Sequence, residues 1–228
     1  MSRMSGDIDS AEEISAFEEN QTFLALVALK DPIRDNMKKM VTEAKDANIA
    51  LSMISGDNLM TAAAVACDVG IISKQEFNRI KEGESSDIAM DASVFRQIVG
   101  DVIREQDDVE DGVEATTSYS LSQENQQAFN ESYFGKVKVI GRADPEDKLR
   151  LIAALQGVQD QVRKVAVVGE GINDLDAFAA ADVSFAVADG TSLARNSASM
   201  ILQTNDFDSC MQAVKWGRNI YMNVRRFL

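Results

Sequence analysis

The chain has 228 residues, 45% hydrophobic and 26% charged, a composition that fits a globular protein and excludes a disordered one. Its formal net charge of −14 argues against binding to nucleic acid, because phosphate backbones are held by clustered Lys and Arg. Histidine is absent, which excludes histidine-based catalysis and ordinary histidine-bearing zinc sites, and no apolar run approaches the ~20 residues of a membrane span.

Apolar runs of strand length alternate with segments of helical spacing, after an acidic linker at residues 1–21. The predicted strands cover Thr22–Leu29, Ile49–Ile54, a patch around Ile88, Lys136–Ile140, Lys164–Val168, Val183–Val187 and Met200–Leu202. The predicted helices cover Ile33–Val41, Asn58–Val69, Ala92–Ile103, Asp144–Gln156, Leu175–Ala181 and a long stretch from Asp206 onward. This alternation predicts an α/β protein with a Rossmann-like parallel sheet flanked by helices.

One segment, Glu105–Gly135, interrupts the alternation. It is polar and acidic and has no periodicity, so we expect an exposed, mobile insertion at the edge of the domain. The alternative is that Val109, Val113 and Phe129 fold back as a short docked hairpin.

A turn of small and acidic residues follows the strand at Ile49–Ile54. Ser55, Gly56 and Asp57 offer a hydroxyl and backbone N–H groups of the kind that hold phosphate oxygens. The structural alternative is that Asp57 only caps the helix that comes next.

A second such turn, Gly169-Glu-Gly-Ile-Asn-Asp174, follows the strand at Lys164–Val168. Its glycines let the backbone approach a ligand, and Glu170 and Asp174 supply hard oxygens suited to Mg²⁺. Alternatively, Asn173 or Asp174 caps the turn. Because the carboxyl ends of parallel strands meet at one edge of a sheet, the two turns together predict a seat for a phosphoryl group and Mg²⁺.

Lys148 lies one turn into the helix that Asp144 opens. A single lysine on a helix is usually a solvated charge. If the start of this helix faces the same sheet edge, the ammonium is instead placed to neutralise phosphoryl oxygens.

Four segments, taken in order, resemble the phosphorylation domain of P-type ion-pumping ATPases, within the haloacid-dehalogenase-like superfamily. They are Asp31-Pro-Ile-Arg34, Ser55-Gly-Asp57, Arg142-Ala-Asp-Pro145-Glu-Asp-Lys148 and Gly169-Glu-Gly-Ile-Asn-Asp174. The tail resembles the stalk that leads into a membrane helix in this family, through Trp216–Tyr221 and Arg225–Leu228. Together with Ala181–Val187, the tail is most similar to calcium pumps of the plasma-membrane type.

The resemblance implies a phosphorylation domain at residues 22–205, with the acidic insertion at 105–135, and a stalk-like helix at 206–228. It implies an ATP-driven cation pump, with Ca²⁺ as the leading ion, at the cytoplasmic face of a membrane that the chain reaches only through residues beyond Leu228. The implied site residues are Lys148, Asn173 and Asp174 for catalysis, Ser55, Gly56 and Asp57 for phosphate, Arg142 for the nucleotide, and Glu170 and Asp174 for Mg²⁺.

Three features depart from the family pattern. The family's phosphorylated aspartate, in an Asp-Lys-Thr-Gly-Thr motif, and its nucleotide-binding domain are not in this sequence, so the chain alone has no acceptor for an aspartyl-phosphate. Glu170 stands where the family has Asp, which moves the carboxylate outward by about an ångström and is expected to weaken or abolish Mg²⁺ binding. Ser55 replaces the usual Thr and keeps the hydroxyl.

Two explanations compete. In the first, the chain is a pump segment whose partners are the missing nucleotide-binding, actuator and transmembrane portions, and the full pump uses ATP. In the second, it is a free-standing, catalytically dead relative that serves as an interaction or scaffold subunit for other proteins. The stalk sequence favours the first explanation, whereas Glu170 and the acidic insertion favour the second. A soluble phosphatase of the same superfamily is a weaker third, because its nucleophile is absent. We interpret the chain as a pump segment that is inactive alone.

Overall fold

The computed structural model describes residues 22–27, 32–84, 87–106, 117–158, 164–204 and 206–228. The chain divides into two units, Met1–Pro32 and Ile33–Leu228. In the first unit, residues 22–27 form no strand, and the side chains of Phe23 and Leu24 are exposed. The described part of the strand predicted over Thr22–Leu29 is therefore not a strand, because a strand needs a neighbour for its backbone hydrogen bonds and no residue in the described ranges pairs with it. Residues 28 and 29 lie outside the described ranges.

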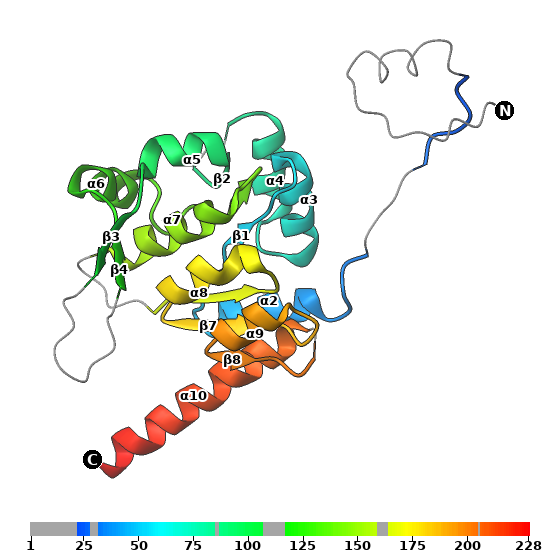
Figure 1. Cartoon of the computed structure of the whole chain (residues 1–228). Helices are drawn as coiled ribbons and strands as arrows, with labels where there is room; N and C mark the ends of the chain where they lie inside the picture. Colours follow the sequence, from blue (N-terminus) through cyan, green and yellow to red (C-terminus); the bar gives the residue numbers. More distant parts are fainter. Residues whose placement is uncertain (1–21, 28–31, 85–86, 107–116, 159–163, 205) are drawn as a thin grey trace, which may run out of the picture. The chain divides into compact units, whose positions relative to one another are not determined.

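The second unit has the predicted α/β fold, with parallel strands and flanking helices (Figure 1). Two three-stranded parallel sheets carry it, in the orders β1-β5-β2 and β6-β7-β8. The strands are β1 (Met53–Ile54), β2 (Ala89–Asp91), β5 (Val139–Gly141), β6 (Ala166–Gly169), β7 (Val183–Ala186) and β8 (Met200–Ile201). A single continuous sheet was the simpler expectation. Within the described ranges, however, β1 is hydrogen-bonded only to β5, and β6 only to β7.

Helices follow most strands, and three α-helices, α4, α6 and α9, are absent from the sequence prediction. The helices are α2 (Met37–Asp46), α3 (Leu59–Val69), α4 (Lys74–Lys81), α5 (Ala92–Val99), α6 (Gln123–Ser132), α7 (Pro145–Gln156), η1 (Ile172–Asp174), α8 (Leu175–Ala180), α9 (Ser192–Ser197) and α10 (Phe207–Phe227). Gly70 ends α3 in the left-handed conformation. The helix predicted to run to Ile103 stops at Val99, because Gly100 also adopts a positive φ.

Apolar contacts between helices connect the two sheets. Leu149 and Ile152 of α7 pack with Ala177 and Ala180 of α8 in one buried cluster, to which Val167 of β6 adds a partly buried side chain. A second cluster gathers side chains of α5, α6, α7, β2 and β5 around the fully buried Phe95. The carboxyl ends of β5 and β6 are thus held near one another by the α7–α8 packing.

The segment Glu105–Gly135 differs from the expected exposed insertion. Strand β3 (Ile103–Gln106) pairs antiparallel with β4 (Thr117–Ser120), and α6 follows. Phe129 is buried against α5, so part of the segment belongs to the core. A single large aromatic side chain can anchor an otherwise polar helix, and a periodicity count misses it. Val109 and Val113 lie outside the described ranges.

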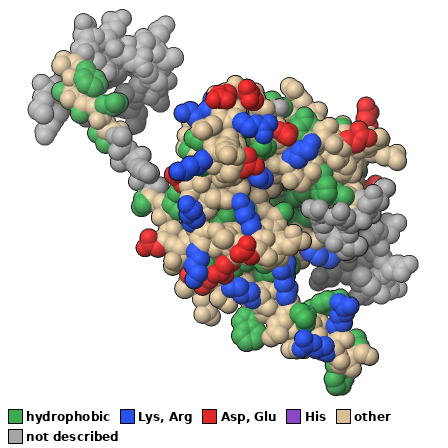
Figure 2. Space-filling view, turned by 180° about the vertical axis from the view of Figure 1, so that it is seen from behind, with side chains coloured by type: hydrophobic (Ala, Val, Ile, Leu, Met, Phe, Trp, Pro, Cys, Tyr) green, Lys and Arg blue, Asp and Glu red, His purple; other side chains and the backbone are tan. Residues whose placement is uncertain are grey.

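The predicted long C-terminal helix is confirmed as α10. The Asp206 carboxylate caps the start of α10 by accepting the N–H of Ser209 at 2.8 Å. In the first turns of the helix, Cys210 and Met211 are buried. From Trp216 onward the side chains are exposed. Figure 2 shows hydrophobic and basic side chains intermixed along this end of the molecule.

Helix α4 is anchored through Glu76. One carboxylate oxygen accepts the Ser73 N–H at 2.6 Å, and the other accepts the Lys138 ammonium at 2.6 Å. Burial opposes ionisation of Glu76, but these hydrogen bonds outweigh it and lower the pKa from 4.5 to about 2. The resulting stabilisation is complete above pH 4.5 and is lost as the pH falls toward 2.

We therefore expect Glu76→Gln to lower the free energy of unfolding by about 2 kcal/mol at neutral pH. The variant should also lose less stability than the parent chain between pH 4.5 and 2. Urea titrations across this range measure both quantities. Parallel pH profiles for the two proteins would contradict the assignment.

Candidate functional site

The turn after β1 is closed by its own side chains. The Ser55 hydroxyl donates to the Asp57 carboxylate at 3.1 Å and accepts the Asp57 N–H at 3.2 Å. Asp57 does not cap α3, and that structural alternative is wrong. The cap is Asn58, whose extended backbone lets its side-chain oxygen accept the Thr61 N–H at 2.9 Å. Gly56 and Asp57 remain exposed at the end of the strand.

The loop between β5 and α7 is hydrogen-bonded to this turn. The N–H of Arg142 donates to the Asp57 carbonyl at 2.7 Å, and the N–H of Ala143 donates to the Ser55 carbonyl at 3.0 Å. Arg142 has a φ of 53° and an exposed side chain 3.8 Å from the Asp91 carboxylate. Gly141 permits the close approach, because a Cβ there would lie 2.5 Å from the Cα of Leu59.

The turn after β6 is organised by Asp174. One oxygen of its carboxylate accepts the N–H groups of Glu170 at 2.9 Å and Gly171 at 3.1 Å, and the other contacts the Lys148 ammonium. Burial of Asp174 opposes its ionisation, but the hydrogen bonds from Lys148 and the two amides hold its pKa below the usual range. The capping role considered for Asp174 is therefore correct, and the same carboxylate also binds Lys148. Asn173 and Glu170 are exposed.

The three segments are joined in series. The Ser55–Asp57 turn bonds to the Arg142–Ala143 loop, this loop enters α7, and Lys148 of α7 reaches Asp174. An ammonium and two turns with exposed backbone are thereby gathered around the carboxyl ends of β1, β5 and β6. This arrangement can bind an anion such as a phosphoryl group. Asp31, the first residue of the segment Asp31-Pro-Ile-Arg34, lies outside the described residues.

The residues present meet the chemical requirement for Mg²⁺ without forming a cage. Mg²⁺ is usually held by one or two carboxylates together with water and phosphate oxygens, and Glu170 and Asp174 supply two carboxylates. Within the described ranges, no group of three or more acidic, Cys or His side chains is placed to hold a metal ion. The carboxylates therefore fit a cation that arrives with a phosphate ligand better than one held by protein alone.

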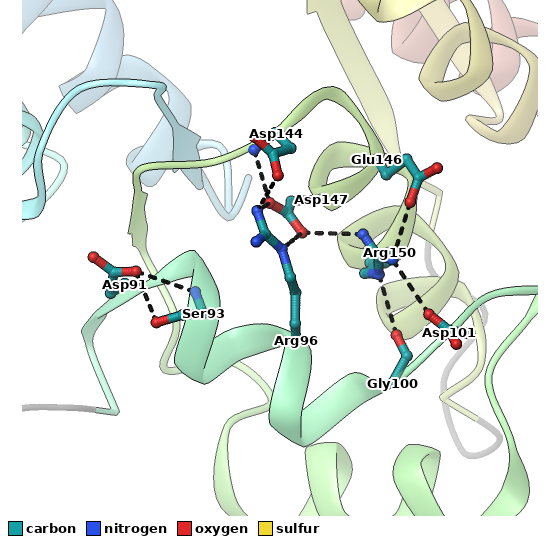
Figure 3. A network of polar contacts seen from close by, with 9 residues as sticks. All are labelled: Asp91, Ser93, Arg96, Gly100, Asp101, Asp144, Glu146, Asp147 and Arg150. Atoms are coloured by element: carbon teal, nitrogen blue, oxygen red, sulfur yellow. Dashed lines mark hydrogen bonds and ion pairs between the residues drawn. The ribbon is translucent and has the colours of Figure 1, made fainter.

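A charge network around the buried Asp147, which was not predicted from the sequence, lies beside this site. Arg96 of α5 binds Asp147 of α7 through two nitrogens, and Arg150 binds the same carboxylate (Figure 3). The available sequence signal was Asp147 three residues after Asp144, the spacing of a helix-capping pair.

The chain matches the model of the haloacid dehalogenase-like hydrolase family over residues 3–182, and it belongs to that family. It is 31% identical over 225 residues to calcium-transporting ATPase 8, plasma membrane-type, of Arabidopsis thaliana, covering 97% of this chain and 18% of the relative. It is also 31% identical over 210 residues to plasma membrane calcium-transporting ATPase 4 of Bos taurus, covering 91% of this chain and 15% of the relative. The chain thus spans less than a fifth of the length of these relatives.

A solved structure supports the fold. A zinc-transporting PIB-type ATPase in the E2.Pi state superposes with a TM-score of 0.52 at 19% identity, over 86% of this chain and 21% of that one. At this identity the likeness concerns the fold alone. The family and the parallel α/β architecture with its C-terminal helix agree with the sequence prediction.

Gly169 gives Asp174 room to cap the turn. A Cβ at position 169 would lie 2.5 Å from the Cγ of Asp174, so we expect Gly169→Ala to displace this carboxylate and cost about 1–3 kcal/mol of stability. Gly171→Ala is the matched control, because a Cβ there meets nothing closer than the Asn173 nitrogen at 3.9 Å. Thermal unfolding measures both variants, and equal losses would refute this role of Gly169.

Proposed function

We propose that this chain is the carboxyl-terminal part of the phosphorylation domain of an ATP-driven P-type cation pump, with Ca²⁺ as the transported ion. The observation that carries the proposal is the serial connection of three motif segments, in which Ser55–Asp57, Arg142–Ala143 and Lys148–Asp174 are linked by hydrogen bonds. The similarity to plasma-membrane calcium-transporting ATPases supports the choice of ion.

Each site residue has a role in this proposal. The backbone N–H of Gly56 binds phosphoryl oxygens, and the Ser55 hydroxyl and the Asp57 N–H join it once they exchange the hydrogen bonds they make within the turn for bonds to the ligand. Lys148 neutralises charge on these oxygens. Asp174 directs the Lys148 ammonium, and the exposed Asn173 contacts the phosphoryl group from the same turn. Arg142 contributes to nucleotide binding. Glu170 and Asp174 would hold Mg²⁺, which when bound screens the negative charge of the phosphoryl group.

The chain alone is proposed to be inactive, since it lacks the family's Asp-Lys-Thr-Gly-Thr motif. The nucleotide-binding, actuator and transmembrane portions of the pump are its proposed partners. Helix α10 carries exposed Trp216, Tyr221 and Phe227 together with Arg225 and Arg226. Aromatic and cationic side chains together suit a lipid headgroup surface, which supports a stalk at the cytoplasmic face of a membrane. No helix among the described residues is long and apolar enough to cross the bilayer itself.

One observation favours a second candidate, a catalytically dead relative that acts as a scaffold subunit. Glu170 occupies the position of the family's metal-binding Asp, and its longer side chain is exposed at the turn. Loss of metal binding would remove selection for the reaction and leave a protein-binding domain. The mass of the chain in its native source separates the two candidates, because a pump segment belongs to a much larger polypeptide or complex.

The purified chain should neither hydrolyse ATP nor take up radiolabelled phosphate, because no acyl-phosphate acceptor is present. Phosphate incorporation after acid quenching measures this directly. Acid-stable label on the polypeptide would overturn the assignment and would direct attention to Asp31, the carboxylate that follows the first apolar run.

Beryllium fluoride with Mg²⁺, a phosphoryl analogue, should bind weakly to the chain in isothermal titration. Glu170→Asp should tighten this binding by about tenfold, since a shift of about an ångström in a ligand position has an effect of this order. Lys148→Met is the control and should abolish the heat signal. Absence of binding in both the parent chain and Glu170→Asp would favour the scaffold function.

A further inference from the structure

Lys148 can act on a phosphoryl group only if α7 directs its ammonium toward that group. Side chains next to Lys148 in the structure can hold α7 in that orientation. The residue before Lys148, Asp147, is fully buried and ionised beside the site. An isolated buried carboxylate is strongly unfavourable, so its position is dictated by its partners.

Four donors surround the Asp147 carboxylate (Figure 3). Arg96 supplies Nε at 2.9 Å and Nη2 at 2.7 Å, a bidentate geometry that fixes direction as well as distance. Arg150 supplies Nη1 at 3.2 Å, and the backbone N–H of Asp144 lies at 2.8 Å. The carboxylate therefore ties the first turn of α7 both to α5 and to the residue that begins the helix.

The same network reaches the phosphate turn. Nη2 of Arg96 also contacts the Asp144 carboxylate at 2.6 Å, which fixes the end of the loop between β5 and α7. In this loop, the N–H groups of Arg142 and Ala143 hold the turn after β1. Arg96 thus supports both components of the site, through Asp147 in the first turn of α7 and through Asp144 at the end of the loop.

We propose that Arg96 and Asp147 form a positioning pair that directs Lys148 toward the turn after β6. This inference rests on the proposed phosphoryl-binding function of that site. Without Arg96, the Asp147 carboxylate loses its bidentate partner and must move toward water. That movement rotates the first turn of α7 and withdraws the Lys148 ammonium from Asp174.

The rate of amine acylation at each lysine, read by peptide mass spectrometry, tests the pair in the folded chain without any ligand. Lys148 should react slowly in the parent chain because it is held by Asp174. Asp174→Asn removes the negative charge of that partner and sets the reference for a released Lys148. Arg96→Met should raise the Lys148 rate by about fivefold, the effect expected from losing one hydrogen bond in an opening equilibrium. The Lys164 rate should stay constant, because its partner Asp182 is untouched.

Lys138→Met is the matched control for a general loss of stability. It removes an ion pair of 2.6 Å to Glu76. Lys138 precedes the amino end of β5, whereas the network lies beyond the carboxyl end of that strand, so the Lys148 rate should stay unchanged. If Arg96→Met does not fold, Arg96→Lys keeps the charge without the bidentate geometry and should give an intermediate rate. An unchanged Lys148 rate in a folded Arg96 variant, or an equal rise in Lys138→Met, would overturn the proposal.

Titration with Mg²⁺ and beryllium fluoride adds a second readout. Arg96→Met should weaken binding in the parent chain but have no further effect in the Lys148→Met background, because the pair acts through Lys148. An additive loss in the double variant would contradict that route. If the parent chain does not bind Mg²⁺ with beryllium fluoride, the proposed phosphoryl-binding function is refuted. The positioning pair is still tested by the acylation rates, which need no ligand.

Discussion

The contact of Lys148 with Asp174 connects two halves of the protein, one built on the sheet β1-β5-β2 and the other on the sheet β6-β7-β8. In the described ranges, no backbone hydrogen bond joins β1 to β6. Lys148 belongs to α7, which follows β5, whereas Asp174 ends the turn that follows β6. A buried carboxylate requires partners, and Asp174 obtains them from the other half through Lys148 and from its own turn through two amides. The placement of the two turns relative to each other therefore depends on this polar contact and on the apolar packing of α7 against α8.

The strongly acidic composition does not make the site itself strongly acidic. Asp147 and Asp174 are each neutralised by Arg or Lys, and the pKa of each lies below its usual range because hydrogen bonds outweigh burial. The carboxylates most involved in the architecture thus carry little uncompensated charge. An anionic ligand bound at the proposed site would then meet the ammonium of Lys148 and the N–H groups of the turn after β1.

Local patterns in the sequence were sufficient for the alternation of strands and helices, for α10, and for the turn that Asp174 caps. They failed where the outcome depends on residues far apart in the chain. Arg96 and Asp147 are 51 positions apart, and no spacing rule connects them. The choice of Asn58 over Asp57 as the cap of α3 was decided by one residue's backbone conformation. Phe129 was assigned to an exposed segment because its polar neighbours conceal a single buried anchor. The division into two sheets is likewise a matter of strand pairing, which periodicity does not encode.

Strand β6 has a consequence for how the protein behaves in solution. Its run Ala166–Gly169 is uncharged and free of proline, and Val168 is 39% exposed, although such continuous apolar runs are typical of strands that are covered on both faces. In the described ranges the strand pairs only with β7, so the backbone groups on its other side are available to an extended segment of any chain. Any pairing of two chains through this edge would increase with protein concentration. Concentration therefore has to be controlled, along with pH and salt, whenever a property of the monomer is measured.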